Sequence, residues 1–241
     1  MKILLIGSTG IIGNIVKEYI NSKDIELYAP KSNELNLRDK NGIGQYLKIS
    51  TLNGQKRFDY IIYCALDKEN VHFEEINIQN LKNIMSYQNY FHTWIHFSSR
   101  AIYDGLGAYK NIPVIAIESL PEPNSPYSRL KYNEERILRK ELSVELYILR
   151  LFDVSNSKKY RDIIQRWREQ AAKKGICKNE VLSPIEPNII KKVIGKILTK
   201  EISSGTYNLC GKQTISAKDI MGFHACGEQI TKTGEMSFEI N

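Results

Sequence analysis

Apolar positions along the first 150 residues follow two alternating periods. Short apolar runs bounded by polar or glycine-rich segments are typical of buried strands, whereas apolar residues spaced three and four apart are typical of helices. Strands and helices that alternate form a parallel sheet with helices on both faces, so the pattern predicts a doubly wound α/β fold. Strands are expected at residues 2–6, 25–28, 60–65, 93–97 and 145–151, and helices at residues 11–21, 42–50, 74–87 and 125–142.

Beyond residue 155 the pattern changes. A helix near residues 160–171, a helix over 188–199 and a short strand over 205–210 are expected, while the last twenty residues predict no element. We therefore expect a main domain at residues 1–155 and a small, trimmed C-terminal lobe at residues 156–241 that does not have to fold independently. The first of these helices has one apolar face, which consists of Tyr160, Ile163, Ile164, Trp167 and Ala171.

Composition narrows the class of protein. The 241 residues are 42% hydrophobic and 25% charged, as in ordinary globular proteins, and no apolar run approaches the length of a membrane span. The first residues show no secretory signal, so we expect a cytoplasmic protein without a membrane partner. The four cysteines are scattered without metal-ligand spacing, which predicts reduced thiols and no metal site: Cys64, Cys177, Cys210 and Cys226.

The net charge of +7 is concentrated in one segment. Residues 151–200 hold twelve Lys and Arg against five Asp and Glu. Such an excess is compatible with nucleic-acid binding, with attraction of a small anionic ligand such as a nucleotide diphosphate, or with a solvated helix face. The three interpretations stay open, and nucleic acid is not the favoured partner.

Three glycines mark the junction of the first strand and the first helix. In GSTGIIG, Gly7 permits a sharp turn, Gly10 permits close approach of a ligand, and Gly13 permits close packing of the helix. The helix directs its free N–H groups and positive dipole end at this turn, which suits a pyrophosphate. The spacing differs from the more familiar Gly-x-Gly-x-x-Gly, but its position predicts a Rossmann-type dinucleotide-binding domain at residues 1–155.

The segment after the second strand distinguishes the two nicotinamide dinucleotides. An NAD site usually has an acidic residue there, which bonds the ribose 2′-hydroxyl. Here Lys31 and Ser32 occupy the region, and no acidic residue follows Tyr28 until Glu34. A cation and a hydroxyl suit a 2′-phosphate, so NADP(H) is favoured over NAD(H), although Lys31 is also compatible with an ordinary surface loop.

A tyrosine and a lysine lie one helical turn apart in PYSRLK. Ser125 and Pro126 suit the start of a helix, which places Tyr127 and Lys131 on the same face. A nearby ammonium lowers the pKa of a phenol, whose usual value near 10 makes it a poor acid–base catalyst at neutral pH. The pair alone is common on helix surfaces. However, Ser99 follows the strand at residues 93–97, at the sheet edge where ligands bind, and its hydroxyl can bond a substrate carbonyl.

Taken together, these motifs resemble the extended short-chain dehydrogenases/reductases, the NAD-dependent epimerase/dehydratase family. GSTGIIG, YIIYCAL, INIQNLKNIM, FSSRAIYDG, YSRLK and LRLFDV occur in the order found in that family, over roughly residues 1–155. SNELNLRDK is similar to the corresponding stretch of its NADPH-dependent sugar-nucleotide reductases, the group of dTDP-4-dehydrorhamnose reductase and GDP-fucose synthase. The resemblance implies a nucleotide-sugar substrate, a substrate-binding role for residues 156–241, and a homodimer as one arrangement.

The resemblance also implies roles for individual residues. Tyr127 would be the general acid, Lys131 would tune it and hold the nicotinamide ribose, and Ser99 would polarise the substrate oxygen. Arg100 and Asp153 would meet the substrate, and Asn77 matches a structural asparagine. The implied cofactor-binding set is Gly7, Thr9, Gly10, Ile11, Ile12, Gly13, Lys31, Ser32, Asn36, Leu37, Cys64, Ala65, Leu66, Tyr127, Lys131 and Phe152.

Three functions follow from this set. The favoured one is reduction of a keto deoxysugar nucleotide with NADPH, and the 4-keto form is the favoured substrate. An epimerase or dehydratase with retained NAD is the alternative, although Arg100 and Ala101 supply no acid–base pair after Ser99. A non-catalytic dinucleotide sensor is the third, and the Ser–Tyr–Lys set argues against it. Arg161, Arg166 and Arg168 are candidates to attract the substrate diphosphate.

Overall fold

The computed structural model describes residues 1–68, 71–106, 120–155, 158–174, 181–211 and 215–216. Six parallel strands form one sheet in the order β2-β1-β3-β4-β5-β7, and two short strands, β6 and β8, pair antiparallel outside it. The strands are β1 (Lys2–Ile6), β2 (Glu26–Tyr28), β3 (Phe58–Tyr63), β4 (Phe91–Ser99), β5 (Glu145–Leu151), β6 (Val181–Leu182), β7 (Gly205–Leu209) and β8 (Ile215–Ser216).

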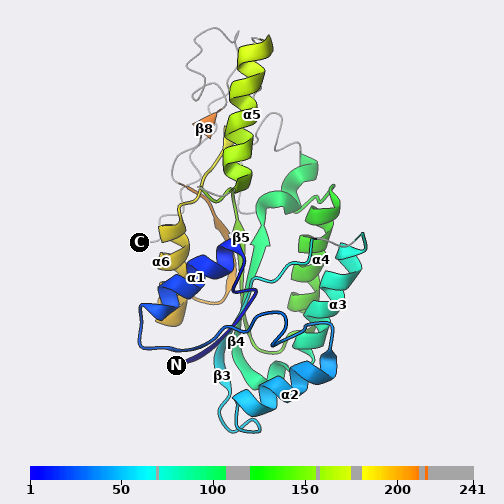
Figure 1. Ribbon diagram of the computed structural model, residues 1–241, viewed down its shortest axis with the longest axis vertical. Helices are drawn as coiled ribbons and strands as arrows, with labels where there is room; N and C mark the ends of the chain where they lie inside the picture. The colour runs from blue at the N-terminus through cyan, green and yellow to red at the C-terminus, as the bar shows by residue number, and fades with distance from the viewer. Residues whose placement is uncertain (69–70, 107–119, 156–157, 175–180, 212–214, 217–241) are drawn as a thin grey trace.

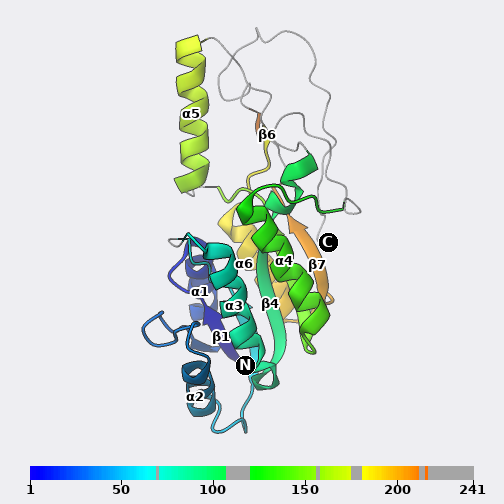
Figure 2. The same ribbon diagram turned by 90° about the vertical axis from the view of Figure 1, so that its right-hand side faces the viewer.

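Helices cover both faces of the large sheet (Figures 1 and 2). Helices α1 and α6 pack against each other on one face, whereas α2, α3 and α4 cover the other. Helix α5 projects beyond the carboxyl ends of the strands. The helices are α1 (Ile11–Asn21), α2 (Lys40–Ser50), α3 (Phe73–Met85), α4 (Pro126–Glu141), α5 (Lys158–Lys174) and α6 (Pro187–Leu198), with 3-10 turns η1 (Gln88–Tyr90) and η2 (Arg100–Leu106).

The apolar runs of the sequence explain the two cores. Alternate residues of a strand point to opposite faces, so Ile3 and Leu5 enter the core under α1 and α6, whereas Leu4 and Ile6 enter the core under α2 and α3. All four side chains are less than 5% exposed. Strands buried on both faces read as continuous apolar runs, which confirms the predicted doubly wound parallel sheet.

The sheet extends further along the chain than the predicted main domain. β7 pairs in parallel with β5, from Tyr147 opposite Gly205 to Leu151 opposite Leu209. Helix α6 buries Ile190, Val193, Ile194 and Ile197 in the core that α1 covers. These two elements therefore belong to the sheet layer although they follow residue 155. The division into residues 1–155 and a substrate lobe at 156–241 remains a prediction. Of the elements after residue 155, α5, β6 and β8 lie outside the large sheet.

The ends of two strands, β4 and β3, differ from the sequence expectation. β4 runs to Ser99 rather than ending at residue 97, so Ser98 and Ser99 are the last two residues of the strand. β3 ends at Tyr63, so Cys64 and Ala65 lie in the loop that follows. Within the described residues, no helix combines the length and the apolar character that a membrane crossing requires.

Candidate active site

The turn between β1 and α1 requires glycine at two of its three glycine positions. Gly7 has φ +81°, and a Cβ built there would lie 2.6 Å from the backbone N of Ala65. A Cβ on Gly13 would lie 2.1 Å from the carbonyl oxygen of Gly7. Among the described residues, a Cβ on Gly10 would meet only that same oxygen, at an ordinary contact distance of 3.5 Å. Gly7 and Gly13 thus serve internal packing, whereas Gly10 borders open space.

The amino end of α1 has the features of an anion site. Gly10 is the N-cap, so no side chain accepts from the first N–H groups of the helix, and Asn14 N is bonded to Gly10 O. The first turn contains no acidic residue that would repel an anion. Free N–H groups and the helix dipole favour a phosphate at this position, and Gly10 leaves room for close approach. These observations fit the pyrophosphate of a dinucleotide.

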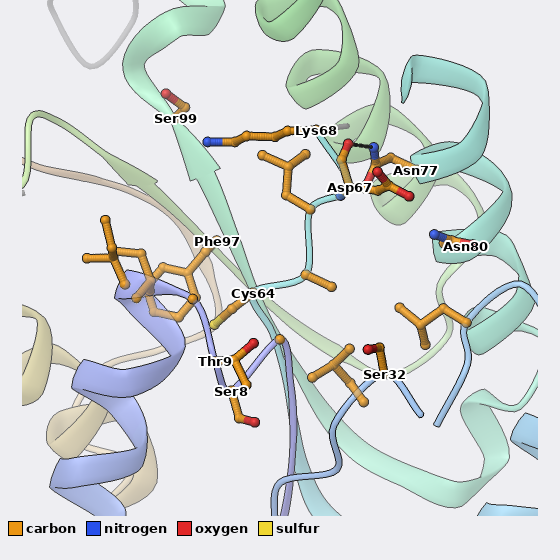
Figure 3. A pocket seen from close by; sticks show the side chains of 18 of the residues that line it. Ser8, Thr9, Ser32, Cys64, Asp67, Lys68, Asn77, Asn80, Phe97 and Ser99 are labelled. Carbon is orange, nitrogen blue, oxygen red and sulfur yellow. Dashed lines mark hydrogen bonds between the residues drawn. The ribbon is translucent and has the colours of Figure 1, made fainter. Parts of the chain in front are cut away.

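A cavity of about 1090 Å³ lies over this turn, at the carboxyl ends of the strands (Figure 3). The large volume suits a ligand of dinucleotide size. Gly13 does not line it and packs beneath the turn instead. The other predicted site residues all line it, namely Gly7, Thr9, Gly10, Ile11, Ile12, Lys31, Ser32, Asn36, Leu37, Cys64, Ala65, Leu66, Ser99, Arg100, Tyr127, Lys131, Phe152 and Asp153.

Two loops, the one after β3 and the one before α2, contribute cavity residues that were not predicted from the sequence. Lys68 lines the cavity and extends toward the side that carries Ser99 (Figure 3). Arg38 reaches from the loop before α2 and forms an ion pair with Asp67. Asn77 fixes the loop after β3, because its side chain accepts from Asp67 N at 2.9 Å and donates to Asp67 O at 2.7 Å. The predicted structural role of Asn77 therefore has a geometric basis.

Ser99, Arg100 and Asp153 meet at the ends of β4 and β5. Ser99 Oγ accepts from Ala101 N at 3.1 Å and is partly exposed to the cavity. Arg100 forms a 2.9 Å ion pair with Asp153, and both side chains are about nine-tenths buried. The guanidinium carbon of Arg100 also lies 5.7 Å from the centroid of the Phe152 ring. The two expected substrate residues thus contact each other, and their charges largely compensate.

Local capping fixes the start of α4 and with it Tyr127. Ser125 is the N-cap and its Oγ accepts from Ser128 N at 3.2 Å, while Pro126 occupies the first turn. Asp104, from η2, accepts from Ser125 N and from the hydroxyl of Ser128. Burial alone would raise the pKa of Asp104, but these hydrogen bonds together outweigh it and lower the pKa. The turn after Ser99 is therefore bound directly to the helix that carries Tyr127.

Lys131 lies deep at the base of the cavity. It is 5% exposed, and its Nζ donates to Glu134 Oε2 at 2.8 Å and to the carbonyl of Phe97 at 3.3 Å. Burial alone would lower the pKa of Lys131, but the charge of Glu134, with a further contribution from Tyr127, outweighs it and raises the pKa. The ammonium is therefore charged at neutral pH. Burial also raises the pKa of the Cys64 thiol, so this cavity-lining group stays protonated.

A second buried network holds the end of β4 from behind. Ser98 donates to Glu135 Oε1 at 2.6 Å, and Arg150 contacts both oxygens of Glu135 at 3.0 and 2.7 Å. Arg150 also donates to the hydroxyl of Tyr103. Burial alone would raise the pKa of Glu135, but the contacts with Arg150 outweigh it and lower the pKa. This network links α4, β4 and β5 directly behind Ser99.

The basic residues of α5 lie mostly away from the cavity. Tyr160, in its first turn, lines the cavity, whereas Arg161, Arg166 and Arg168 are exposed and do not. Ile163 and Ile164 pack against Trp167, as the predicted apolar face requires. The side chain of Ala171, the cysteines Cys177 and Cys226 and the last twenty residues lie outside the described part of the chain.

Comparisons with known proteins agree with this fold. A family profile described as "RmlD substrate binding domain" matches residues 1–233. A search of curated proteins finds no match. Solved structures also resemble this chain, and those described next are less than 25% identical to it and establish the fold.

Three of these structures are a dTDP-4-dehydrorhamnose reductase from Clostridium acetobutylicum, one from Bacillus anthracis in complex with NADP, and a UDP-glucose 4-epimerase from Thermus thermophilus in complex with NAD. Their identities are 17%, 15% and 16%, with TM-scores of 0.69, 0.64 and 0.67. The alignments cover 92% of this chain in each case, and 78%, 79% and 81% of the other chain.

Proposed function

Because the chain belongs to the RmlD substrate binding domain family, we propose that it is an NADPH-dependent reductase of a keto sugar nucleotide, with a 4-keto deoxysugar nucleotide as the favoured substrate. The observation that carries this proposal is the convergence of Ser99, Tyr127 and Lys131 on the cavity above the glycine turn. These three side chains come from the end of β4 and the first turns of α4, which Asp104 binds together.

The cavity supports a nicotinamide dinucleotide. The pyrophosphate fits the uncapped amino end of α1 beside Gly10, and Lys31 and Ser32 border the same cavity near β2. Between the end of β2 and Glu34 the chain has no carboxylate. The side chain of Glu34 accepts a hydrogen bond from Lys31 N. A 2′-phosphate therefore meets a cation rather than a repelling anion, which favours NADPH over NADH. The solved structures with NADP and with NAD bound are compatible with either.

The residues of this chain have separate chemical tasks. A reduced nicotinamide, when bound, supplies the hydride that the keto carbon receives. Ser99 donates a hydrogen bond to the keto oxygen, and Tyr127 gives that oxygen the proton that completes the alcohol. Lys131 holds its positive charge beside Tyr127 and favours the phenolate that remains. Phe152 and the Arg100–Asp153 pair shape the wall where the sugar would lie.

The competing function is epimerisation with retained NAD, which the likeness to UDP-glucose 4-epimerase favours. An epimerase returns the hydride to its substrate and so consumes no reduced cofactor. The two functions are separated by stoichiometry. A reductase oxidises one NADPH per sugar nucleotide, whereas an epimerase shows no loss of the reduced cofactor's absorbance and holds NAD through purification.

The test is a screen of 4-keto sugar nucleotides with NADPH and NADH, read by the absorbance loss of the reduced cofactor. Tyr127→Phe is expected to lower kcat by at least about 100-fold, since positioned proton transfer contributes roughly 10²–10⁴. NADPH affinity should survive the substitution. Tyr132→Phe is the matched control, because Tyr132 lies on the same helix and does not line the cavity. Unchanged turnover in Tyr127→Phe would remove Tyr127 as the acid.

A further inference from the structure

Lys131 is held from behind by a carboxylate that the proposed reaction does not use. Glu134 lies one turn further along α4 and is 0% exposed. Its Oε2 accepts from Lys131 Nζ at 2.8 Å and also lies 3.3 Å from Nε2 of His96, which is likewise 0% exposed. Lys131 therefore donates a hydrogen bond to this carboxylate oxygen, and the His96 ring lies beside the same oxygen. Among the described residues, the other oxygen of Glu134 has no hydrogen-bond partner.

Neighbouring elements close this cluster off from water. His96 comes from the middle of β4, and its ring stacks on Tyr63 of β3 with a centroid distance of 5.8 Å. Lys131 is the one member that also borders the cavity. The groups that act electrostatically on Lys131 are Glu134, Tyr127 and Cys64. The carboxylate of Glu134 therefore compensates the charge of Lys131 from inside the protein. On the cavity side, the Lys131 ammonium faces Tyr127 and would face a bound ligand.

The charges of the cluster sum to zero. Burial alone would raise the pKa of Glu134, but Lys131 and His96 outweigh it and lower the pKa, so Glu134 is ionised. Burial lowers the pKa of His96 more than Glu134 raises it, so the imidazole is neutral at pH 7. One ammonium thus faces one carboxylate. Removal of a partner from a buried ion pair leaves an uncompensated charge, which is strongly unfavourable.

We propose that Glu134 is a positioning residue that fixes the Lys131 ammonium at the base of the cavity, and that binding of the nicotinamide half of the cofactor depends on it. The inference rests on the proposed function, in which Lys131 contacts the nicotinamide ribose. The adenosine half would lie against Lys31, Ser32 and Asn36, which line the cavity from the segment after β2, whereas Glu134 belongs to α4 and does not line the cavity. A substitution of Glu134 should therefore weaken the binding of the nicotinamide half of the dinucleotide and leave the binding of the adenosine half unchanged.

The test compares two ligands on the full-length protein: NADPH, and adenosine 2′,5′-bisphosphate, which lacks the nicotinamide ribose. In Glu134→Gln, the Kd for NADPH is expected to rise at least about tenfold while that for the bisphosphate stays within about twofold, since truncating a buried charge pair acts locally. Glu141→Gln, an exposed glutamate of the same helix, is the control and should change neither. Equal losses for the two ligands, or no loss for either, would overturn the proposal.

Glu134→Asp separates charge from packing. Glutamine keeps the shape of Glu134 and loses its charge, whereas aspartate keeps the charge and is shorter. The proposal predicts that the Glu134→Asp variant binds NADPH more tightly than the Glu134→Gln variant, and the reverse order contradicts it. If Glu134→Gln does not fold, the two ligands are compared on Glu134→Asp, where a loss confined to NADPH is expected and equal losses refute the proposal. Wild-type protein that binds NADPH but reduces no keto sugar would refute the reductase alone.

Discussion

The glycine turn allows stability and ligand binding to be perturbed separately. A Cβ on Gly13 would lie 2.1 Å from Gly7 O, more than 1 Å inside an ordinary contact of 3.4 Å. The obstacle is backbone, so α1 must move away from the turn as a unit. Overpacking of this kind costs about 1–3 kcal/mol, and for a chain of this size each kcal/mol lowers Tm by about 2–4 °C. Gly13→Ala should therefore lower Tm by roughly 2–12 °C.

Gly10→Ala is the matched variant. Its backbone, with φ −75° and ψ 169°, suits alanine, and its Cβ would meet only Gly7 O at 3.5 Å. Stability should change by less than about 1 kcal/mol, because the N-cap loses no side-chain hydrogen bond. Dinucleotide binding should weaken at least about tenfold, since the methyl group occupies the space into which the phosphate would come.

Two measurements on purified protein decide the matter: thermal unfolding by circular dichroism, and NADPH titration by fluorescence. The reasoning predicts a loss of stability in Gly13→Ala and a loss of affinity in Gly10→Ala at nearly wild-type stability. Gly13→Ala with unchanged Tm would refute the packing argument. Gly10→Ala with unchanged NADPH affinity would refute the placement of the pyrophosphate.

Two further predictions concern charge. Lys31→Ala should weaken the binding of NADPH several-fold more than the binding of NADH. Lys48 is an exposed lysine of α2 outside the cavity, so Lys48→Ala should change neither affinity. Equal effects of Lys31→Ala on the two cofactors would remove the argument for a 2′-phosphate. Asp104 has a lowered folded-state pKa, so its contribution to stability is present above its ordinary value of 3.8 and is lost as pH falls through the folded pKa. Asp104→Asn should therefore lower the free energy of unfolding by about 1 kcal/mol at pH 7. Urea unfolding should show that the difference between wild type and variant becomes smaller below pH 4. A difference that does not change with pH would contradict the role assigned to Asp104.

The sheet could be predicted because its strands are buried on both faces. Runs such as KILLI and YIIY have one interpretation once helical segments separate them. The pairing of β7 with β5 could not be predicted, since the short run at residues 205–209 carries no information about its neighbour. Tertiary packing through α6, which buries Ile190 and Ile194 with α1, determines that position.

The site divides in the same way. The placement of Gly10, Tyr127 and Ser99 around one cavity could be predicted, because each lies at a junction where the end of a strand or helix fixes its direction. Lys68 and Arg38 were missed, because long side chains on loops reach the cavity only through the path of the loop. Glu134 was missed for a different reason. In KYNEERILRK it looks like one charge of a polar face, and only its spacing of three from Lys131 hinted at the buried pair.

The central claim is that this cavity transfers hydride from NADPH to a keto sugar nucleotide without returning it. The most direct measurement is a reaction with NADPH deuterated at the transferred position of the nicotinamide ring, followed by mass spectrometry of the sugar nucleotide. The account predicts one deuterium on the product carbon, one NADP released per turnover, and loss of this transfer in Tyr127→Phe. Interconversion of sugar nucleotides with no deuterium incorporated and no cofactor oxidised would contradict it.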